Sequence, residues 1–159
     1  MLVYFVRHGI AEDGATFQGS DAERPLTAKG SRKMAEIGKR LAELDLKPNA
    51  ILTSPLVRAR QTAEIVATEL RLSARVGDDE RLAGGFNVQQ LGAILSERTD
   101  ADGLMLVGHE PAMSAVIGHV TGDARVEMKK GAVACVEFSD PASARGVLLW
   151  LATPKILIG

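Results

Sequence analysis

Short apolar runs alternate with helical stripes of apolar residues along the chain. Runs dominated by apolar residues at 2–6, 50–53 and 104–107 predict strands that are buried on both faces of a sheet. Between these runs, at 34–44 and 59–70, apolar residues recur at the three- and four-residue spacing of an amphipathic helix. This alternation predicts an α/β fold, a three-layer sandwich in which helices flank a mostly parallel central sheet.

The remaining predicted elements are shorter. Residues 74–77 are expected to form a short strand, and residues 88–95 a helix. Apolar segments at 132–138 and 147–152 are separated by a polar turn that contains a proline, a pattern typical of an antiparallel hairpin. We therefore expect an antiparallel strand near the C-terminus, which makes the sheet mixed.

Capping residues locate the ends of the two predicted long helices. Thr27 is expected to cap the first helix, because its side-chain oxygen can accept a hydrogen bond from a backbone N–H of the first turn. Lys47 and Pro48 are expected to end that helix. Ser54 followed by Pro55 is typical of a capping residue and the first helical position, and predicts the start of the next helix.

The composition is that of an ordinary folded protein. The chain has 159 residues, of which 46% are hydrophobic and 25% charged, close to the average for soluble domains. This length fits one domain, and we expect residues 1–159 to form it. Lysine and arginine number 19 against 20 for aspartate and glutamate, so the formal net charge is -1. That balance argues against a nucleic-acid or membrane-surface partner, although it is compatible with a local basic pocket.

Cysteine usage and hydrophobic run lengths indicate a cytoplasmic protein. The single cysteine, Cys135, cannot form an internal disulfide and cannot anchor a thiolate zinc site. No apolar run approaches the roughly 20 residues that span a bilayer. The run at 2–6 is too short for the apolar region of a signal peptide.

Three predicted strands are followed by residues that can carry chemistry. Residues 7–9 read Arg-His-Gly, residues 54–60 contain two arginines, and residues 108–111 read Gly-His-Glu-Pro. In open α/β sheets, ligands bind beyond the carboxyl ends of the strands, so these segments are expected to meet at one edge. A helix is expected after residues 108–111, ending near residues 121–122. The third histidine, His119, lies inside it and is expected to be structural or exposed.

Two arginines, Arg58 and Arg60, follow Pro55 closely. A cation in the first turn of a helix opposes the helix dipole at a cost of about 0.3–1 kcal/mol. An anion bound at the same helix start would explain the placement. Helical spacing does not choose between the two arginines, and Arg60 also fits a solvated side chain lying along the helix.

Together these residues predict a site for a phosphoryl group. Guanidinium groups match phosphate oxygens in bidentate geometry, a protonated histidine adds a charged donor, and a neutral histidine can attack phosphorus. The sequence contains no Gly-x-x-x-x-Gly-Lys-Ser/Thr loop, no Gly-x-Ser-x-Gly elbow and no His-Glu-x-x-His motif.

At these motifs the chain resembles the histidine phosphatase superfamily. Segments 7–9, 53–63 and 108–111 match its first histidine motif, its arginine motif and its second histidine motif, in that order. The short chain and the segments 23–30 and 128–132 are similar to the SixA-type phosphohistidine phosphatases in particular. The likeness extends from the first residue to about residue 138.

The resemblance implies a mechanism and assigns residues to it. His8 would take the phosphoryl group and become a phosphohistidine intermediate, which water then hydrolyses. Arg7, Arg58 and His109 would hold the phosphate oxygens and stabilise the charge of the transition state, so the resemblance selects Arg58 over Arg60. The family implies no metal and no organic cofactor.

Two further residues have open roles. Glu80 lies in a segment similar to one that carries the general acid in relatives acting on phosphomonoesters, and an exposed loop carboxylate is an equally good interpretation. Arg24 lies in a family-like loop that can reach the site and bind substrate, or can simply be solvated.

The substrate is expected to be a phosphorylated protein, such as a phosphotransfer domain. Relatives that act on small molecules carry a larger insertion in the region corresponding to 72–104, and here that region holds little more than one short helix, which predicts an open site. Three alternatives remain: a phosphatase of small phosphomonoesters with Glu80 as acid, a phosphate-binding module without turnover, and a metallohydrolase, which lacks a recognisable third ligand. Mutase activity is less favoured, because the short insertion would hold an intermediate poorly.

Overall fold

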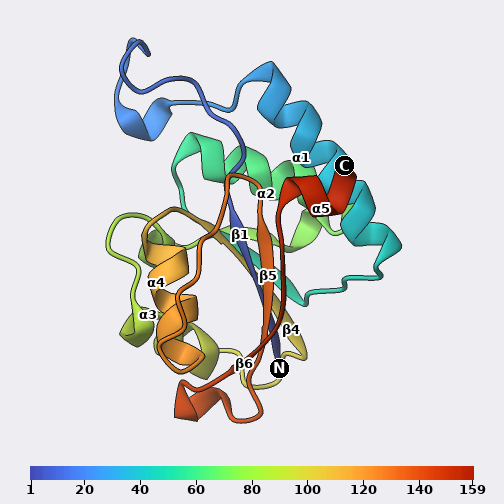
Figure 1. Cartoon of the computed structure of the whole chain (residues 1–159), viewed down its shortest axis with the longest axis vertical. Coiled ribbons are helices and arrows are strands. Elements are labelled where there is room, and N and C mark those ends of the chain that lie inside the picture. Colours follow the sequence, from blue (N-terminus) through green and yellow to red (C-terminus); the bar gives the residue numbers. More distant parts are fainter.

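All six strands of the protein join one mixed sheet. The computed structural model describes all 159 residues, and its strands stand in the order β3-β2-β4-β1-β5-β6. The first four in this order run parallel, whereas β5 is antiparallel to both of its neighbours. The strand bounds are β1 Leu2–Arg7, β2 Ala50–Thr53, β3 Val76–Asp78, β4 Gly103–Gly108, β5 Val133–Glu137 and β6 Val147–Ala152. The predicted mixed sheet and C-terminal hairpin are confirmed (Figure 1).

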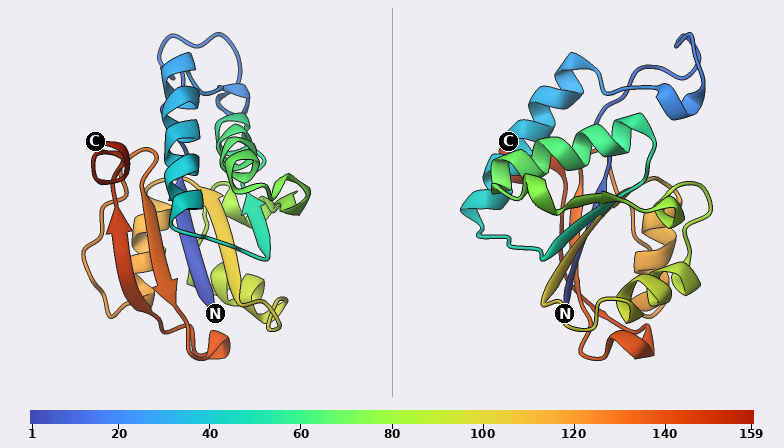
Figure 2. Two further views of the ribbon diagram at one scale, coloured as in Figure 1. Left: turned by 90° about the vertical axis from the view of Figure 1, so that its right-hand side faces the viewer. Right: turned by 180° about the vertical axis from the view of Figure 1, so that it is seen from behind.

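Helices cover both faces of this sheet and complete three layers (Figure 2). On one face lie α1 (Ala28–Glu43), α2 (Val57–Leu70) and the short α5 (Pro154–Ile158), and on the other lie α3 (Val88–Ser96) and α4 (Ala112–Val120). Single 3-10 turns, among them η1 (Asp21–Glu23) and η3 (Glu80–Leu82), lie in the connecting loops. The predicted three-layer sandwich is confirmed.

The central strands are apolar throughout because both of their faces are buried. In β1, Val3 and Phe5 pack into the cluster beneath α3 and α4. Their neighbours Tyr4 and Val6 pack into the cluster beneath α1 and α2. Successive side chains of a strand point to opposite faces, so a strand between two helical layers needs apolar residues at every position.

The predicted caps are right for the first helix and wrong for the second. The Thr27 hydroxyl accepts a hydrogen bond from the Gly30 N–H at 2.9 Å, as expected. The second helix begins at Val57 instead of Pro55, with Leu56 before it and no side-chain cap. Ser54 continues the hydrogen bonding of the sheet beyond the end of β2, since its N–H donates to the Val107 carbonyl of β4 at 3.0 Å. The hydroxyl that was expected to cap a helix is used in the site.

The first helix also ends earlier than predicted. It stops at Glu43, and Asp45 adopts a left-handed conformation with φ of 57° that breaks the helical path. Lys47 and Pro48 therefore lie in the loop that leads to β2, at the edge of the sheet where the parallel strands begin. None of the five helices is both long enough and apolar enough to cross a membrane.

Candidate active site

The two motif histidines follow neighbouring strands at paired positions. Arg7 at the end of β1 lies opposite Gly108 at the end of β4, and the His8 N–H donates to the Gly108 carbonyl at 3.1 Å. His8 and His109 therefore leave the sheet side by side, and their ring centroids are 5.2 Å apart. The predicted convergence of these segments at one edge of the sheet is confirmed.

His8 is held in one tautomer by the backbone. Its side chain is buried, and its Nδ1 lies 2.8 Å from the Gly9 carbonyl oxygen. A carbonyl can only accept, so Nδ1 carries the ring hydrogen and Nε2 keeps a free lone pair. Burial lowers the pKa of His8, the hydrogen bond to Gly9 acts to raise it, and the nearby His109, Arg58 and Arg7 lower it, so that the pKa is about 3. At neutral pH His8 is an uncharged base whose Nε2 can attack an electrophile.

His109 is oriented by Ser54. The Nε2 atom of His109 lies 2.7 Å from the Ser54 hydroxyl oxygen. When that hydroxyl donates to Nε2, the ring hydrogen is on Nδ1, a buried atom that has no partner in the protein. Burial, followed by the charge of Arg58, lowers the pKa of His109 to about 4. His109 is therefore neutral in the unliganded protein, and an anion bound beside it would raise its pKa.

The two arginines at the site are anchored through their terminal nitrogens. Arg7 donates from Nη1 to the Met128 carbonyl at 2.9 Å. Arg58, which is 6% exposed, donates from Nη1 to the Asp21 carbonyl at 2.7 Å and from Nη2 to the Asp21 carboxylate at 3.0 Å. These bonds fix the orientation of both guanidinium planes before any ligand arrives.

Three polar atoms at this site have no partner. The only buried side-chain nitrogen or oxygen atoms of the whole chain without a hydrogen bond are Arg7 Nε, Arg58 Nε and His109 Nδ1. Buried polar groups are almost always paired in folded proteins, because an unpaired group loses its hydration without compensation. Three such nitrogens on residues that gather around His8 can bind the oxygens of a tetrahedral oxyanion.

Arg58 and Arg60 have different surroundings, although they are two residues apart. The half-exposed Arg60 pairs with Glu64 at 2.7 Å and with Asp78 at 2.6 Å. Both partners lie on the outer surface, so Arg60 is a solvated helix residue and does not join the site. The buried arginine is Arg58, the one that the family resemblance selects.

Arg24 reaches the edge of the site through Asp21. Its guanidinium contacts the Asp21 carboxylate at 3.0 Å and donates to the Glu12 carbonyl at 2.7 Å. Hydrogen bonds from Arg24 and then Arg58 hold the pKa of Asp21 below its usual range. Arg24 is therefore tied to Arg58 through a shared carboxylate, and its contact with substrate stays a prediction. Asp21 has no motif of its own, and only its spacing three residues before Arg24 hinted at a pair.

Glu80 lies at the rim of the same edge. The preceding Asp79 donates its N–H to the Thr53 carbonyl at the end of β2 at 2.8 Å, which places η3 beside the strand ends. The Glu80 side chain is exposed and forms no hydrogen bond or ion pair. Glu80 is therefore close to the site, but no contact in the structure assigns it a function. Its role as a general acid stays a prediction.

Two hydroxyl residues of the site were missed as such in the sequence. The sequence indicates Ser54 only as a helix cap, and Thr62 only as part of the arginine motif. The Thr62 hydroxyl accepts from the Gly9 N–H at 3.1 Å and donates to the Arg58 carbonyl at 2.8 Å. Thr62 thereby joins the turn after His8 to the helix that carries Arg58. The contacts of Thr62 with Gly9 and of Ser54 with His109 have no sequence signal, because each joins residues from separate segments.

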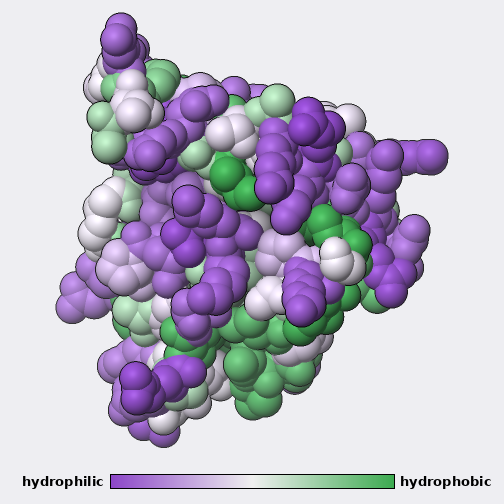
Figure 3. Space-filling view, turned by 45° about the horizontal axis from the view of Figure 1, so that its top comes forward, coloured by the Kyte–Doolittle hydropathy of each residue, from purple (hydrophilic) through white to green (hydrophobic).

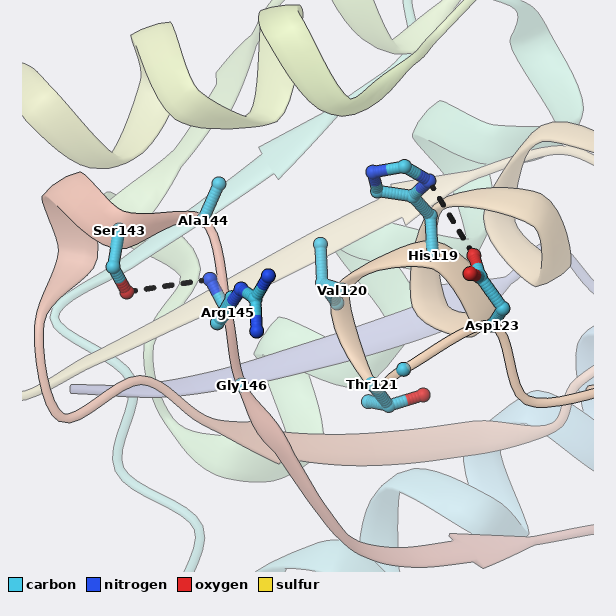
Figure 4. A pocket seen from close by; sticks show the side chains of 9 residues that line it. His119, Val120, Thr121, Asp123, Ser143, Ala144, Arg145 and Gly146 are labelled. Carbon is cyan, nitrogen blue, oxygen red and sulfur yellow. Dashed lines mark hydrogen bonds and ion pairs between the residues drawn. The ribbon is translucent and has the colours of Figure 1, made fainter.

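His119 lies away from this site, as expected. It lines a hollow of about 420 Å³ with Asp123 and the segment 143–146 (Figure 4). This hollow lies where β5 turns toward β6, at the edge of the sheet where β1 begins. The side chain of His119 is 64% exposed, and its nearest ionic partner is Asp123 at 3.7 Å. No group of three or more His, Cys, Asp or Glu side chains is placed to hold a metal ion.

Known proteins are similar to this chain in sequence and in fold. Phosphohistidine phosphatase SixA of Escherichia coli is 26% identical over 157 residues, which cover 97% of this chain and 94% of that protein. A solved structure of the protein histidine phosphatase SixA complexed with tungstate superposes with a TM-score of 0.88 at 25% identity, covering 98% of each chain.

Other relatives match over parts of their length. A protein of Picosynechococcus sp. is 44% identical over 117 residues, 70% of this chain and 67% of that protein. Several longer curated relatives match over 42% of this chain and 31% of their own length. The model of the histidine phosphatase superfamily (branch 1) matches residues 3–84, just over half of the chain. The chain therefore belongs to the histidine phosphatase superfamily, and its similarity is to the SixA-type members along nearly its whole length.

Proposed function

We propose that this phosphatase hydrolyses phosphohistidine on protein substrates through a covalent phosphohistidine intermediate on His8. One observation carries the proposal. The neutral, buried His8 keeps a free lone pair on Nε2, and the only three unpaired buried nitrogens of the chain belong to Arg7, Arg58 and His109 around it. A nucleophile surrounded by oxyanion-binding donors is the arrangement that phosphoryl transfer requires.

The reaction proceeds in two transfers. The Nε2 lone pair of His8 attacks phosphorus, a new N–P bond forms, and the N–P bond to the substrate imidazole breaks. The released imidazole takes a proton from solvent. Water then attacks the phosphorus on His8, the N–P bond breaks, and inorganic phosphate leaves with the free enzyme restored. Throughout, Arg7, Arg58 and His109 hold the equatorial oxygens, where negative charge collects.

The identity of the leaving group favours a phosphohistidine substrate. An alkoxide needs a proton from a positioned acid as it leaves, whereas an imidazole is a better leaving group. The candidate acid, Glu80, is exposed at the rim and its side chain forms no hydrogen bond or ion pair. The short segment between β3 and β4 carries only η3 and α3, which is consistent with an open site for a protein surface. The full-length similarity to SixA supports the same substrate class.

A phosphatase of small phosphomonoesters is the second candidate. Its support is the position of η3 beside the ends of β2 and β4, which brings Glu80 to the correct edge of the sheet. An exposed carboxylate there can approach a leaving oxygen once a small substrate is bound. This candidate requires that Glu80 donate a proton to the alkoxide.

Hydrolysis rates separate these candidates. The purified protein is assayed on a phosphorylated histidine phosphotransfer domain and on common sugar and nucleotide phosphates. A higher kcat/KM on the domain is expected, and a preference for the small esters would overturn the proposal. Glu80→Gln is expected to change hydrolysis of the domain by less than about twofold, whereas an acid role predicts a loss of about 100-fold on small esters.

The nucleophile is tested by substitution. His8→Ala is expected to abolish phosphate release and the acid-labile phosphoenzyme, while circular dichroism shows a folded chain. The matched control is His119→Ala, which removes a histidine at the opposite edge and should leave turnover unchanged. Full activity in His8→Ala would contradict the mechanism. Absence of turnover in the wild type, with tight phosphate binding, would instead indicate a binding module.

A further inference from the structure

A groove of about 580 Å³ adjoins the candidate active site at the same edge of the sheet. Because β5 and β6 form a hairpin, the turn before β5 and the segment after β6 meet at this edge, with Val133 opposite both Val6 and Ala152. The residues that line the groove are Arg7, Ile10, Lys129, Lys130, Thr153, Pro154 and Lys155. Since Arg7 also belongs to the candidate active site, the groove continues outward from it.

The turn that carries two of these lysines is tied to the active site at both ends. At its start, the Met128 carbonyl accepts the hydrogen bond from Arg7 Nη1 at 2.9 Å. At its end, the Gly131 N–H donates to the carbonyls of Arg7 and His8, at 3.1 Å each. Gly131 has φ of 78°, a conformation that glycine adopts without strain. The backbone of Lys129 and Lys130 is therefore held at a fixed position beside the nucleophile.

The charge of the groove is positive and largely uncompensated. Its lining contains one arginine and three lysines and no acidic residue. Lys129 pairs with Glu127, whereas Lys130 and Lys155 are exposed and form no ion pair. This local excess occurs in a chain whose net charge is -1. Figure 3 shows that hydrophilic side chains predominate over the upper part of the face that it presents. A cationic groove of this kind attracts anionic groups in the molecule that enters the active site.

We propose that this groove binds acidic side chains of the phosphorylated protein that flank its phosphohistidine. The inference rests on the proposed function, because it names the surface of that same substrate. With the phosphoryl group beside His8, the chain of the partner extends over Arg7 toward Lys130 and Lys155. Carboxylates of aspartate or glutamate in that segment then pair with the two free ammonium groups.

The type of cation favours a protein surface over a second phosphate of a small molecule. An ammonium group is a strongly hydrated point charge on a flexible stem, and it lacks the bidentate geometry with which a guanidinium fork fixes a phosphate. Exposed lysines at the rim of an open groove steer an oppositely charged partner during encounter and tolerate variation in its contacts. Acidic side chains on a protein meet those conditions.

Binding is measured first without phosphate chemistry. A fluorescent, unphosphorylated peptide of alternating glutamate and glycine is titrated at about 20 mM salt and again at about 200 mM salt. Lys130→Ala/Lys155→Ala is expected to bind it about five- to tenfold more weakly than the wild type at low salt. The matched control, Lys47→Ala/Arg145→Ala, removes the same charge from the opposite edge of the sheet and should bind as the wild type does. Equal affinity of the two double variants overturns the inference.

Turnover then tests the groove in the reaction. Two phosphohistidine peptides, one flanked by glutamates and one by glutamines, are compared with free phosphohistidine. The wild type is expected to prefer the glutamate peptide about tenfold in kcat/KM. Lys130→Ala/Lys155→Ala should lose that preference and hydrolyse free phosphohistidine at the wild-type rate, because neither lysine belongs to the phosphate site.

The outcomes distinguish the inference from the function on which it rests. If the wild type hydrolyses both peptides equally, the proposed role of the groove is wrong, whereas the proposed phosphohistidine phosphatase activity still stands. If the wild type hydrolyses none of the three substrates, the proposed function is wrong, and so is the substrate assigned to the groove. Lysine-dependent hydrolysis of a small bisphosphate, with no effect on the peptides, also overturns the inference.

Discussion

The carboxylate of Asp21 lies 3.0 Å from Nη2 of Arg58, so a guanidinium expected to bind phosphate is already paired with an anion. The same carboxylate contacts Arg24 at 3.0 Å. Arg58 is buried, whereas the side chain of Asp21 is 64% exposed. An incoming oxyanion therefore competes with a largely exposed carboxylate for a buried cation.

Removing the charge of Asp21 is expected to tighten oxyanion binding. Asp21→Asn keeps the size of the side chain but removes the negative charge that competes for Arg58. An exposed ion pair contributes up to about 1 kcal/mol, so inhibition constants of tungstate and vanadate should fall about two- to fivefold. Asp123→Asn, an exposed change at the opposite edge, should leave them unaltered. Weaker inhibition in Asp21→Asn would show that this carboxylate organises the site instead of competing with the ligand.

The contact between Ser54 and His109 predicts a kinetic effect. Ser54→Ala removes the hydroxyl that lies 2.7 Å from Nε2 of His109, so the imidazole ring is no longer held in one tautomer. Loss of one such hydrogen bond corresponds to about 1 kcal/mol, or roughly five- to tenfold in kcat. Phosphate release after rapid mixing measures this effect. An unchanged kcat in the variant would show that Ser54 has no role in the reaction.

Thr62 is expected to matter for stability. Thr62→Val keeps the shape of the side chain but leaves the N–H of Gly9 without its partner at 3.1 Å. A buried unpaired N–H costs about 1–3 kcal/mol. Urea denaturation should show a loss of that size, and Thr62→Ser, which retains the hydroxyl, should lose much less. Equal losses in the two variants would assign the effect to packing.

Acidification is expected to destabilise the protein partly through His8. Its pKa is lowered from 6.5 to about 3 in the folded state, so between these values the unfolded chain binds a proton that the folded chain does not. Stability attributable to His8 is therefore complete above about pH 6.5 and falls as the pH drops toward 3. In His8→Gln, the fall in the free energy of unfolding from about pH 7 to about pH 5 should be smaller by up to about 2 kcal/mol. An identical slope in both proteins would contradict the low pKa.

Two helical glycines should respond oppositely to the same substitution. A Cβ at Gly30 in α1 would lie 2.0 Å from the Ile10 carbonyl oxygen, in the loop after His8, so Gly30→Ala should destabilise the protein by several kcal/mol or displace that loop. A Cβ at Gly92 in α3 meets nothing within 4 Å. Gly92→Ala should stabilise the protein by about 0.5–1 kcal/mol, because alanine favours the helix. Thermal unfolding of both variants measures these effects, and a stable Gly30→Ala with unchanged activity would contradict the close approach.

Much of the fold follows from local pattern. In β1 the residues from 3 to 6 are all apolar, because helices cover both faces of this strand. The buried strands could therefore be predicted from the apolar run itself. The second helix could not be started correctly in the same way. Ser54 and Pro55 have the local preferences of a helix start, but the Ser54 hydroxyl is 2.7 Å from His109, a residue far along the chain. Tertiary pairing overrode the local preference.

The sequence by itself determined which side chains meet at this end of the sheet. Arg7 ends one strand, and His8 and His109 directly follow neighbouring strands that the local sequence pattern predicts. Only the tertiary structure decided how those side chains are poised. The pairing of Arg58 with Asp21, the burial that keeps His8 neutral, and the approach of Lys130 and Lys155 to one groove all join segments distant in the chain. The physical reason is that strand and helix patterns arise between near neighbours, whereas burial and charge are properties of the folded surroundings.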